Sequence, residues 1–179
     1  MESVVIDYSD RNEVERVSGQ GLVPVIDDNG RVVVGSMEIV RHLEERYPDP
    51  PLYPADDARR AEMLIFIDWF NQIWKRPPNE IATELGKPDP DHERIAVLAG
   101  EMAAAQDGFE AMLAGRDHLM GEDFSGADCA AFPFLKYALF RDPADDELFH
   151  RILDKHQQLG ETHPRLADWL RRVNERPRA

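Results

Sequence analysis

Residues 21–36 constrain the fold of this 179-residue chain more than any other segment. They predict a β-hairpin with strands near 22–27 and 31–34, because β-branched stretches flank Asn29-Gly30 and such a tight turn favours positive φ at both positions. Pro24 lies inside the expected first strand, where a proline removes a donor from the ladder. A proline at such a position often follows a cis peptide bond, so we expect one before Pro24.

Apolar spacing on either side of the hairpin predicts one further strand and two short helices. The strand is expected at 3–7, and the first helix at 11–18. A second helix is expected over 37–47, with Ser36 as its N-cap and a stripe of apolar residues on one face. The prolines at 48, 50, 51 and 54 then predict a rigid linker at 49–56.

Beyond the linker the pattern is helical throughout. Two prolines after Arg76 should end or kink the first of these helices, because a proline inside a helix removes a donor and clashes with the preceding turn. No internal repeat is present. The architecture expected is β-α-β-β-α followed by an all-α region, with helices at 57–74, 91–113, 124–140, 145–159 and 165–175.

Composition excludes several classes of protein. The formal net charge of -14 argues against nucleic acid or an anionic membrane surface as a partner. The single cysteine, Cys129, cannot form an intrachain disulfide, and the six histidines show no metal-ligand spacing. We also find no signal peptide and no apolar stretch of bilayer length. A cytoplasmic protein without a metal is therefore expected.

Several motifs, in their order along the chain, resemble the cytosolic glutathione transferase superfamily. They lie at residues 22–25, 35–39, 47–54, 124–128 and 163–170. The resemblance implies a thioredoxin-like N-terminal domain over 1–48, the proline-rich linker at 49–56, and an all-α C-terminal domain over 57–179. It also implies glutathione as a co-substrate, a small apolar electrophile as the second substrate, and a homodimer.

The resemblance assigns glutathione-binding positions to Val23, Pro24, Gly35 and Ser36. In the family, the residue before the cis-proline offers its backbone N–H and C=O to the cysteinyl part of the tripeptide, and here that residue is Val23. Ser36 matches the serine that receives the γ-glutamyl carboxylate, at a helix N-terminus that favours an anion. Gly35 departs from the family, which usually has Glu or Asp there to pair with the ammonium group of the ligand.

The catalytic element of the family has no match in this sequence. The strand at 3–7 resembles the family's second strand, so the N-terminal domain is expected to be truncated by its first β-α unit. The family's thiol-activating Tyr, Ser or Cys begins the helix of that unit, and Tyr8 and Ser9 follow the second strand instead. A naturally shortened relative, with its sheet rebuilt by rearrangement or dimerisation, and a misplaced start site are both compatible with this pattern.

Three further groups of residues have structural and functional interpretations. Trp69, Phe70 and Trp74 follow helical spacing, and belong either to the core or to the wall of an apolar pocket for the electrophile. Ser125 and Asp128 form a helix-capping pattern, a structural role. Cys129 is expected to be a buried structural residue.

The function that the resemblance implies is that of a glutathione transferase homologue, which conjugates glutathione to small electrophiles if the catalytic element is present. The alternative is a non-catalytic binding or interaction protein of the same fold.

Overall fold

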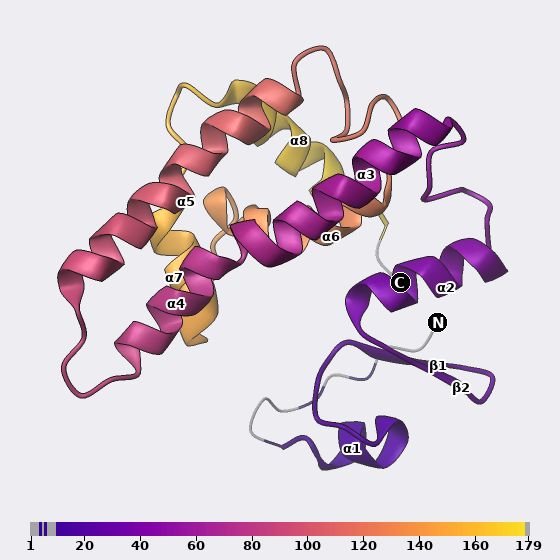
Figure 1. Cartoon of the computed structure of the whole chain (residues 1–179), viewed down its shortest axis with the longest axis horizontal. Helices are drawn as coiled ribbons and strands as arrows, with labels where there is room; N and C mark the ends of the chain where they lie inside the picture. Colours follow the sequence, from indigo (N-terminus) through magenta and orange to yellow (C-terminus); the bar gives the residue numbers. More distant parts are fainter. Residues whose placement is uncertain (1–3, 5, 7–9, 178–179) are drawn as a thin grey trace. The chain divides into compact units, whose positions relative to one another are not determined.

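The computed structural model describes residues 4, 6 and 10–177, and the chain divides into two compact units (Figure 1). The first unit comprises residues 1–53 with 177–179, and the second comprises residues 54–176. Most of the strand expected at 3–7, together with Tyr8 and Ser9, lies outside the described residues.

The first unit is built on the predicted hairpin, which is confirmed. Its elements are α1 (Asn12–Ser18), β1 (Val25–Asp28), β2 (Arg31–Val34) and α2 (Ser36–Arg46). The two strands pair antiparallel, with Val25 opposite Val34 and Asp28 opposite Arg31. Positive φ angles of 55° at Asn29 and 90° at Gly30 close the turn.

Two details of the hairpin prediction are wrong. β1 begins at Val25, so Pro24 precedes the strand and removes no donor from the ladder, although the Val23–Pro24 bond is cis as predicted. Ser36 is the first residue of α2 and not its N-cap. Gly35 occupies the N-cap with φ 91°, a conformation that glycine adopts without steric cost.

A hydrogen-bonded cluster around the buried His42 fixes α2 to the hairpin. Asp28 Oδ2 lies 2.8 Å from His42 Nε2, and the Tyr47 hydroxyl donates to Asp28 Oδ1 at 3.1 Å. His42 is only 4% exposed, although it is a polar residue. The hydrogen bond from His42, with that from Tyr47, lowers the pKa of the Asp28 carboxyl. The end of β1 is therefore held to α2 by polar contacts.

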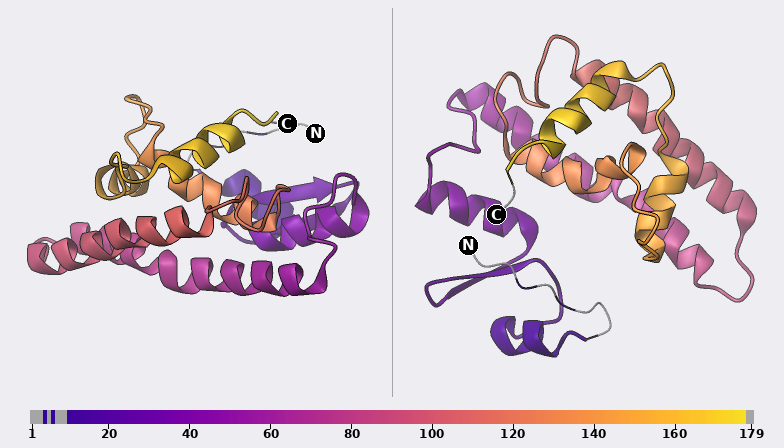
Figure 2. Two further views of the ribbon diagram at one scale, coloured as in Figure 1. Left: turned by 90° about the horizontal axis from the view of Figure 1, so that it is seen from above. Right: turned by 180° about the vertical axis from the view of Figure 1, so that it is seen from behind.

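The second unit contains only helices. Seen from above, α6, α7 and α8 lie on one side of the layer that the preceding helices make (Figure 2). Its elements are α3 (Asp57–Trp69), the π-helix η1 (Phe70–Trp74), α4 (Arg76–Leu85), α5 (His92–Met112), α6 (Gly126–Leu135), the 3₁₀-helix η2 (Lys136–Ala138), α7 (Leu148–His156) and α8 (Pro164–Asn174).

The helix α4 was not predicted, because prolines were expected to end the helix before it. Pro77 and Pro78 instead lie in the first turn of α4, where the missing N–H has no intrahelical partner to lose. The stretch expected as one helix over 57–74 changes from α to π geometry at Phe70. The helix expected at 124–140 is shorter, with a 3₁₀ turn after Leu135.

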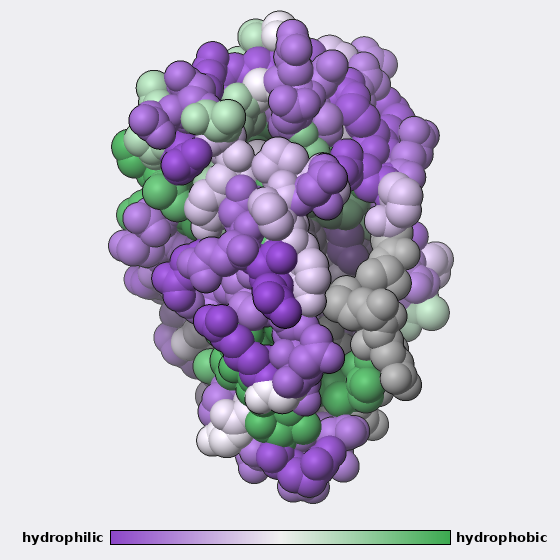
Figure 3. Space-filling model, turned by 90° about the vertical axis from the view of Figure 1, so that its right-hand side faces the viewer, coloured by the Kyte–Doolittle hydropathy of each residue, from purple (hydrophilic) through white to green (hydrophobic). Residues whose placement is uncertain are grey.

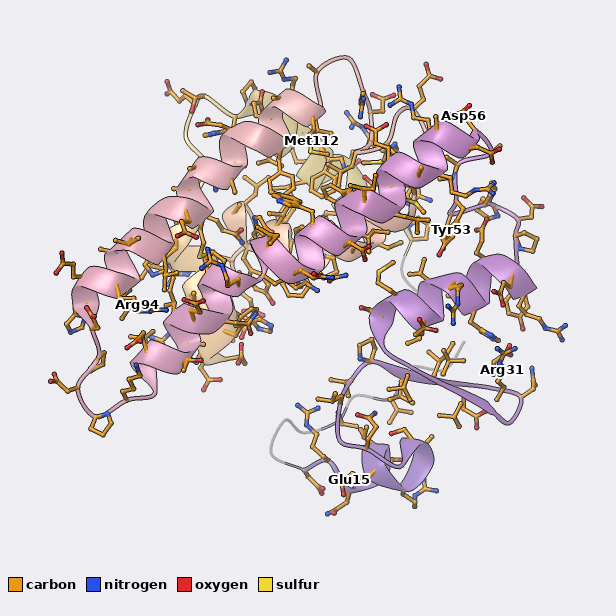
Figure 4. All side chains as sticks on the ribbon, viewed as in Figure 1. Glu15, Arg31, Tyr53, Asp56, Arg94 and Met112 are labelled. Carbon is orange, nitrogen blue, oxygen red and sulfur yellow. The ribbon has the colours of Figure 1, made fainter. Side chains whose placement is uncertain are left out.

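The core of the second unit is aromatic and aliphatic. Its largest fully buried side chains include Met63, Phe70, Phe109 and Trp169. At the rim, Arg94 on α5 lies beside α4 and pairs with Glu80 at 2.7 Å (Figure 4). An exposed pair of this kind contributes little, so burial of apolar surface supplies most of the stability of the unit.

Asp128 is the most highly hydrogen-bonded side chain of the core, and it is fully buried. Its Oδ1 accepts from the Leu119 amide at 3.0 Å and from Trp169 Nε1 at 2.8 Å. Its Oδ2 accepts from the amide and the hydroxyl of Ser125, both at 2.9 Å, within the capping box that begins α6. One carboxylate therefore joins a loop, the start of α6 and the middle of α8.

Glu110, on α5, caps the neighbouring helix α8. Its carboxylate accepts from the Leu166 amide at 2.8 Å and from Arg165 Nε at 2.8 Å. Burial acts to raise the pKa of Glu110, but the backbone N–H groups of Leu166 and Arg165 and the Arg165 guanidinium outweigh it, so the net direction is downward. The first turn of α8 thus receives its anion from another helix.

We predict that Asp128→Ala lowers the free energy of unfolding by about 3 kcal/mol or more, because it leaves several buried donors unsatisfied. Asp128→Asn should cost clearly less, since its amide oxygen can still accept from Leu119 and Trp169. Urea denaturation followed by the fluorescence of the tryptophans measures both values. Equal losses for the two variants would contradict the proposed role of the hydrogen bonds.

We predict that Glu110 contributes to acid denaturation. Its pKa is lower in the folded chain, so its stabilising effect is present above its unfolded-state pKa and is lost as the pH falls through its folded-state pKa. Glu110→Gln should therefore lower stability by about 1–3 kcal/mol at pH 7, and by less in acid. Thermal melts from pH 7 down to pH 3 test this, and a loss of stability that is constant over this range would exclude the linkage.

Candidate functional site

The junction between the hairpin and α2 brings together the glutathione-binding positions inferred from the sequence. The Gly35 amide donates to the Pro24 carbonyl oxygen at 3.0 Å, one residue before β1 and one residue after β2. Val23, next to Pro24, is 46% exposed and lies outside the strand ladder. Val23 is therefore placed beside the start of α2, and the residue is partly exposed there.

The N-terminus of α2 is open to a ligand. Ser36 is exposed, and in the described part of the chain no side chain caps this helix. The Ile39 amide bonds to Gly35, whereas the amides of the first three helical residues have no intrahelical acceptor. Together with the helix dipole, these N–H groups and the Ser36 hydroxyl form a surface that favours an anionic oxygen.

The backbone at Gly35 adopts a conformation that favours glycine. An added Cβ would meet no atom within 4 Å, but φ 91° is a conformation that L-residues rarely adopt. The nearest acidic side chain in the first turn of α2 is Glu38, which pairs with Arg41. Residue 35 therefore supplies backbone geometry and no carboxylate.

The three predicted pocket residues belong to one aromatic cluster of the second unit. Phe70 and Trp74 stack with ring centroids 4.5 Å apart, and Trp69 meets Phe70 at 6.5 Å. Phe70 and Trp74 are buried, at 0% and 4% exposure, whereas Trp69 is 38% exposed. Of the three, Trp69 is the side chain that can contact a ligand at the surface, and a pocket wall there stays a prediction.

Cys129 lies just inside α6 and is not an activated thiol. Burial, with the neighbouring Asp128 carboxylate, raises the pKa of Cys129 to about 11. The thiol is therefore protonated at neutral pH, as expected for a structural cysteine.

Polar clusters elsewhere give no second reaction centre. The structure shows no metal-binding group of three or more His, Cys, Asp or Glu within residues 10–177 and positions 4 and 6. His150 contacts the carboxylates of Asp145, at 2.8 Å, and Glu147, at 3.7 Å, and His163 contacts that of Asp107 at 3.0 Å. None of the helices in the described range has the length and apolar character needed to cross a bilayer. Figure 3 shows hydrophilic residues over most of the face that it displays.

The sequence pattern predicts only a helix end at Lys75 and no functional role for its side chain. Its side chain is half-buried between aromatic rings of the second unit, with its Nζ 4.1 Å from the centroid of Phe134. The sequence signal for this environment is the position of Lys75 directly after the aromatic residues Trp69, Phe70 and Trp74. Helical spacing alone does not place Phe134 beside Lys75.

Family comparisons identify both units of the chain. Residues 1–51 match the sequence model of the glutathione S-transferase N-terminal domain, and residues 92–172 match that of the glutathione S-transferase C-terminal domain. The two models match in the order that the motifs predict and together span most of the sequence.

Individual relatives agree with this assignment. Glutathione S-transferase GstB of Escherichia coli K12 is 28% identical over 165 residues, which cover 88% of this chain and 71% of GstB. FtsZ-localized protein A of Caulobacter vibrioides is 29% identical over 133 residues, 66% of this chain and 57% of that protein.

A solved structure supports the fold. The theta class glutathione S-transferase of Xanthomonas axonopodis pv. citri, crystallised with glutathione bound, is 26% identical with a TM-score of 0.67. The match covers 95% of this chain and 76% of that one. The hairpin with its cis-proline, the helical second unit and both domain matches lead to one conclusion: the chain belongs to the glutathione S-transferase superfamily.

Proposed function

We propose that this chain binds glutathione at the junction of the hairpin and α2, and that its family activity is conjugation of the glutathione thiol to a small electrophile. The observation that supports this most directly is the uncapped N-terminus of α2 with the exposed Ser36 hydroxyl, beside the partly exposed residue Val23. Glutathione carries an extended peptide backbone, which can pair with the backbone of Val23. It also carries a γ-glutamyl carboxylate, which can accept hydrogen bonds from the Ser36 hydroxyl and the first amides of α2.

The proposed complex uses each residue for one part of the tripeptide. Val23 pairs its backbone N–H and C=O with the cysteinyl residue, and Pro24 and Gly35 hold that backbone in place through their 3.0 Å hydrogen bond. Ser36 and the first-turn amides of α2 receive the γ-glutamyl carboxylate. The ammonium group of the ligand has no acidic partner at Gly35, so we expect weaker binding than a carboxylate there would give.

The chemistry proposed is nucleophilic substitution by sulfur. The thiol loses its proton to solvent, the thiolate sulfur forms a bond to the electrophilic carbon, and the leaving group departs with the electron pair of the broken bond. Holding both molecules together lowers the entropic part of the barrier. The sequence has no match for the family's thiol-activating residue, so glutathione binding and transfer are tested separately.

A second candidate is a non-catalytic binding protein with the same half-site. The similarity to FtsZ-localized protein A favours it, because the name of that relative describes a location on another protein and not a transferase reaction. In this case glutathione binds without conjugation. We further propose a homodimer, for which light scattering of the full chain should give twice the 20.5 kDa mass of the chain.

Ser36→Ala should weaken glutathione binding by roughly 1–3 kcal/mol, the usual loss for a hydrogen bond to a charged group. Isothermal titration calorimetry on the full chain measures the dissociation constant. Thr83→Ala, which removes an exposed hydroxyl from α4, serves as the matched control and should leave it unchanged.

The absence of heat with millimolar glutathione would exclude the binding proposal. Binding without thioether formation, measured by absorbance with chlorodinitrobenzene as the electrophile, would favour the non-catalytic protein.

Trp69→Ala and Phe70→Ala should separate a ligand contact from a core contact. Trp69→Ala should reduce the affinity for the apolar electrophile chlorodinitrobenzene, because the variant removes the exposed ring that we propose as the pocket wall. Phe70→Ala should lower the free energy of unfolding by about 3–5 kcal/mol, because Phe70 is fully buried. Calorimetry and urea denaturation provide the two measurements, and an unchanged affinity for chlorodinitrobenzene in Trp69→Ala would contradict the pocket.

A further inference from the structure

A groove runs along α7 in the second unit, beside the loop at 139–147 that follows η2. One part of it is a cavity of about 190 Å³ between this loop and the side chains of α7. A second hollow, of about 440 Å³, lies further along α7. Arg141, Arg151 and Asp154 line both hollows, so the two are continuous. Ligand pockets commonly measure roughly 300–1,000 Å³, so the groove has room for a small molecule.

One end of the groove is cationic. Arg151 and Lys155 are four residues apart on α7, so they lie on the same face of the helix. Arg141 lines the same hollow from the loop, where it pairs with Asp154 at 3.3 Å. Arg151 and Lys155 form no ion pair and no aromatic contact with any residue that the structure describes. Like charges at this spacing repel each other, and an anion in the groove would relieve the repulsion.

The opposite end of the groove is acidic. The loop contributes Asp142, Asp145 and Asp146 to the cavity. None of these three lines the hollow that contains Lys155. Asp145 is occupied by His150, whose Nδ1 lies 2.8 Å from Asp145 Oδ2. Asp146 is exposed and forms no ion pair within the described part of the chain, so its carboxylate can receive a cation.

The acidic end also has an aromatic wall. The ring of His150 stacks on that of Tyr137, with the centroids 4.7 Å apart and the planes at 22°. Tyr137 is buried, and both residues line the cavity. Within the loop, the Ala144 amide donates to Asp142 Oδ1 at 2.9 Å. These contacts hold the groove in shape without a ligand, which lowers the entropic cost of binding one.

We propose that this groove binds a small soluble molecule that carries a phosphate monoester at one end and a primary amine at the other. The phosphate accepts hydrogen bonds from Arg151 and Lys155, and the ammonium group donates to Asp146. A phosphate monoester carries a charge of about −1.5 to −2 at pH 7, so it matches two unpaired cations better than a carboxylate does. The carbon chain between the two charged groups packs against the wall formed by Tyr137 and His150.

This site goes beyond the proposed glutathione binding. All residues of the groove belong to the second unit, whereas the proposed glutathione contacts belong to the first. A loss of glutathione binding in Ser36→Ala thus says nothing about the groove. A failure at the groove likewise leaves the glutathione proposal intact.

The test is a titration of the isotope-labelled full chain at pH 7 and constant ionic strength, followed by nuclear magnetic resonance. The probe is O-phosphoethanolamine, and the comparison ligands are inorganic phosphate, ethanolamine and glycerophosphoethanolamine. We expect the probe to shift the backbone amide signals of α7, with a dissociation constant roughly threefold or more below that of each comparison ligand.

The comparison ligands decide the assignment. Glycerophosphoethanolamine has the headgroup structure of a lipid, but as a diester it carries a single negative charge, so it should bind more weakly than the probe. Equal affinity for the diester overturns the choice of a monoester, and equal affinity for inorganic phosphate overturns the role of the amine. The absence of shifts in α7 at tens of millimolar probe overturns the site.

Variants at exposed positions separate the two ends of the groove. Arg151→Gln should weaken the binding of both phosphoethanolamine and inorganic phosphate by roughly threefold or more, because both lose a cation. Asp146→Asn should weaken phosphoethanolamine relative to inorganic phosphate, because only the former has an amine. Arg171→Gln, on α8, is the matched control and should change neither affinity. Equal effects of Arg151→Gln and Arg171→Gln, or an unchanged affinity ratio in Asp146→Asn, overturn the proposal.

Discussion

The helical unit depends on one buried carboxylate. Asp128 has no exposed surface, and it accepts hydrogen bonds from Leu119, Ser125 and Trp169. A carboxyl group at such depth is favourable only when its oxygens are hydrogen-bonded, so the donors from the loop, α6 and α8 must all stay in place. The loop before α6, the start of α6 and the middle of α8 are consequently fixed by the same group.

The first unit is held together differently. Of its described apolar side chains, Val14 and Val40 are buried, and Leu22 and Val23 are largely exposed. The cluster of Asp28, His42 and Tyr47 therefore takes a larger part in fixing α2 against the hairpin. This arrangement leaves backbone donors at the start of α2 free, and free donors are what a peptide ligand with a carboxylate needs.

The two units of the chain offer different chemistry. The first unit offers hydrogen bonds and a helix N-terminus, which can bind and orient a tripeptide. The second offers an aromatic cluster in which Trp69 reaches the surface and Lys75 lies against Phe134. Cys129 takes no part in nucleophilic chemistry at neutral pH, because burial keeps its thiol protonated.

The local elements and the family are both predictable from the amino-acid sequence. Asn29-Gly30 predicts the hairpin because few other residues accept positive φ there, and Pro24 after Val23 predicts the cis bond. Helical periodicity predicts most of the helices of the second unit, and Ser125 with Asp128 predicts the start of α6. These signals are local, since they depend on backbone conformations and spacings within a few residues.

Contacts between residues far apart in the sequence depend on how the helices pack. Helical spacing groups Trp69, Phe70 and Trp74, but their different burial depends on Phe109 and Phe134, which come from other helices. The helical stretch ends before Pro77 and Pro78 as predicted, but the local sequence does not show that a new helix, α4, begins with these prolines in its first turn. Glu110 capping α8 and Lys75 facing Phe134 join residues more than 50 positions apart, and packing of the whole core, not periodicity, sets such pairs.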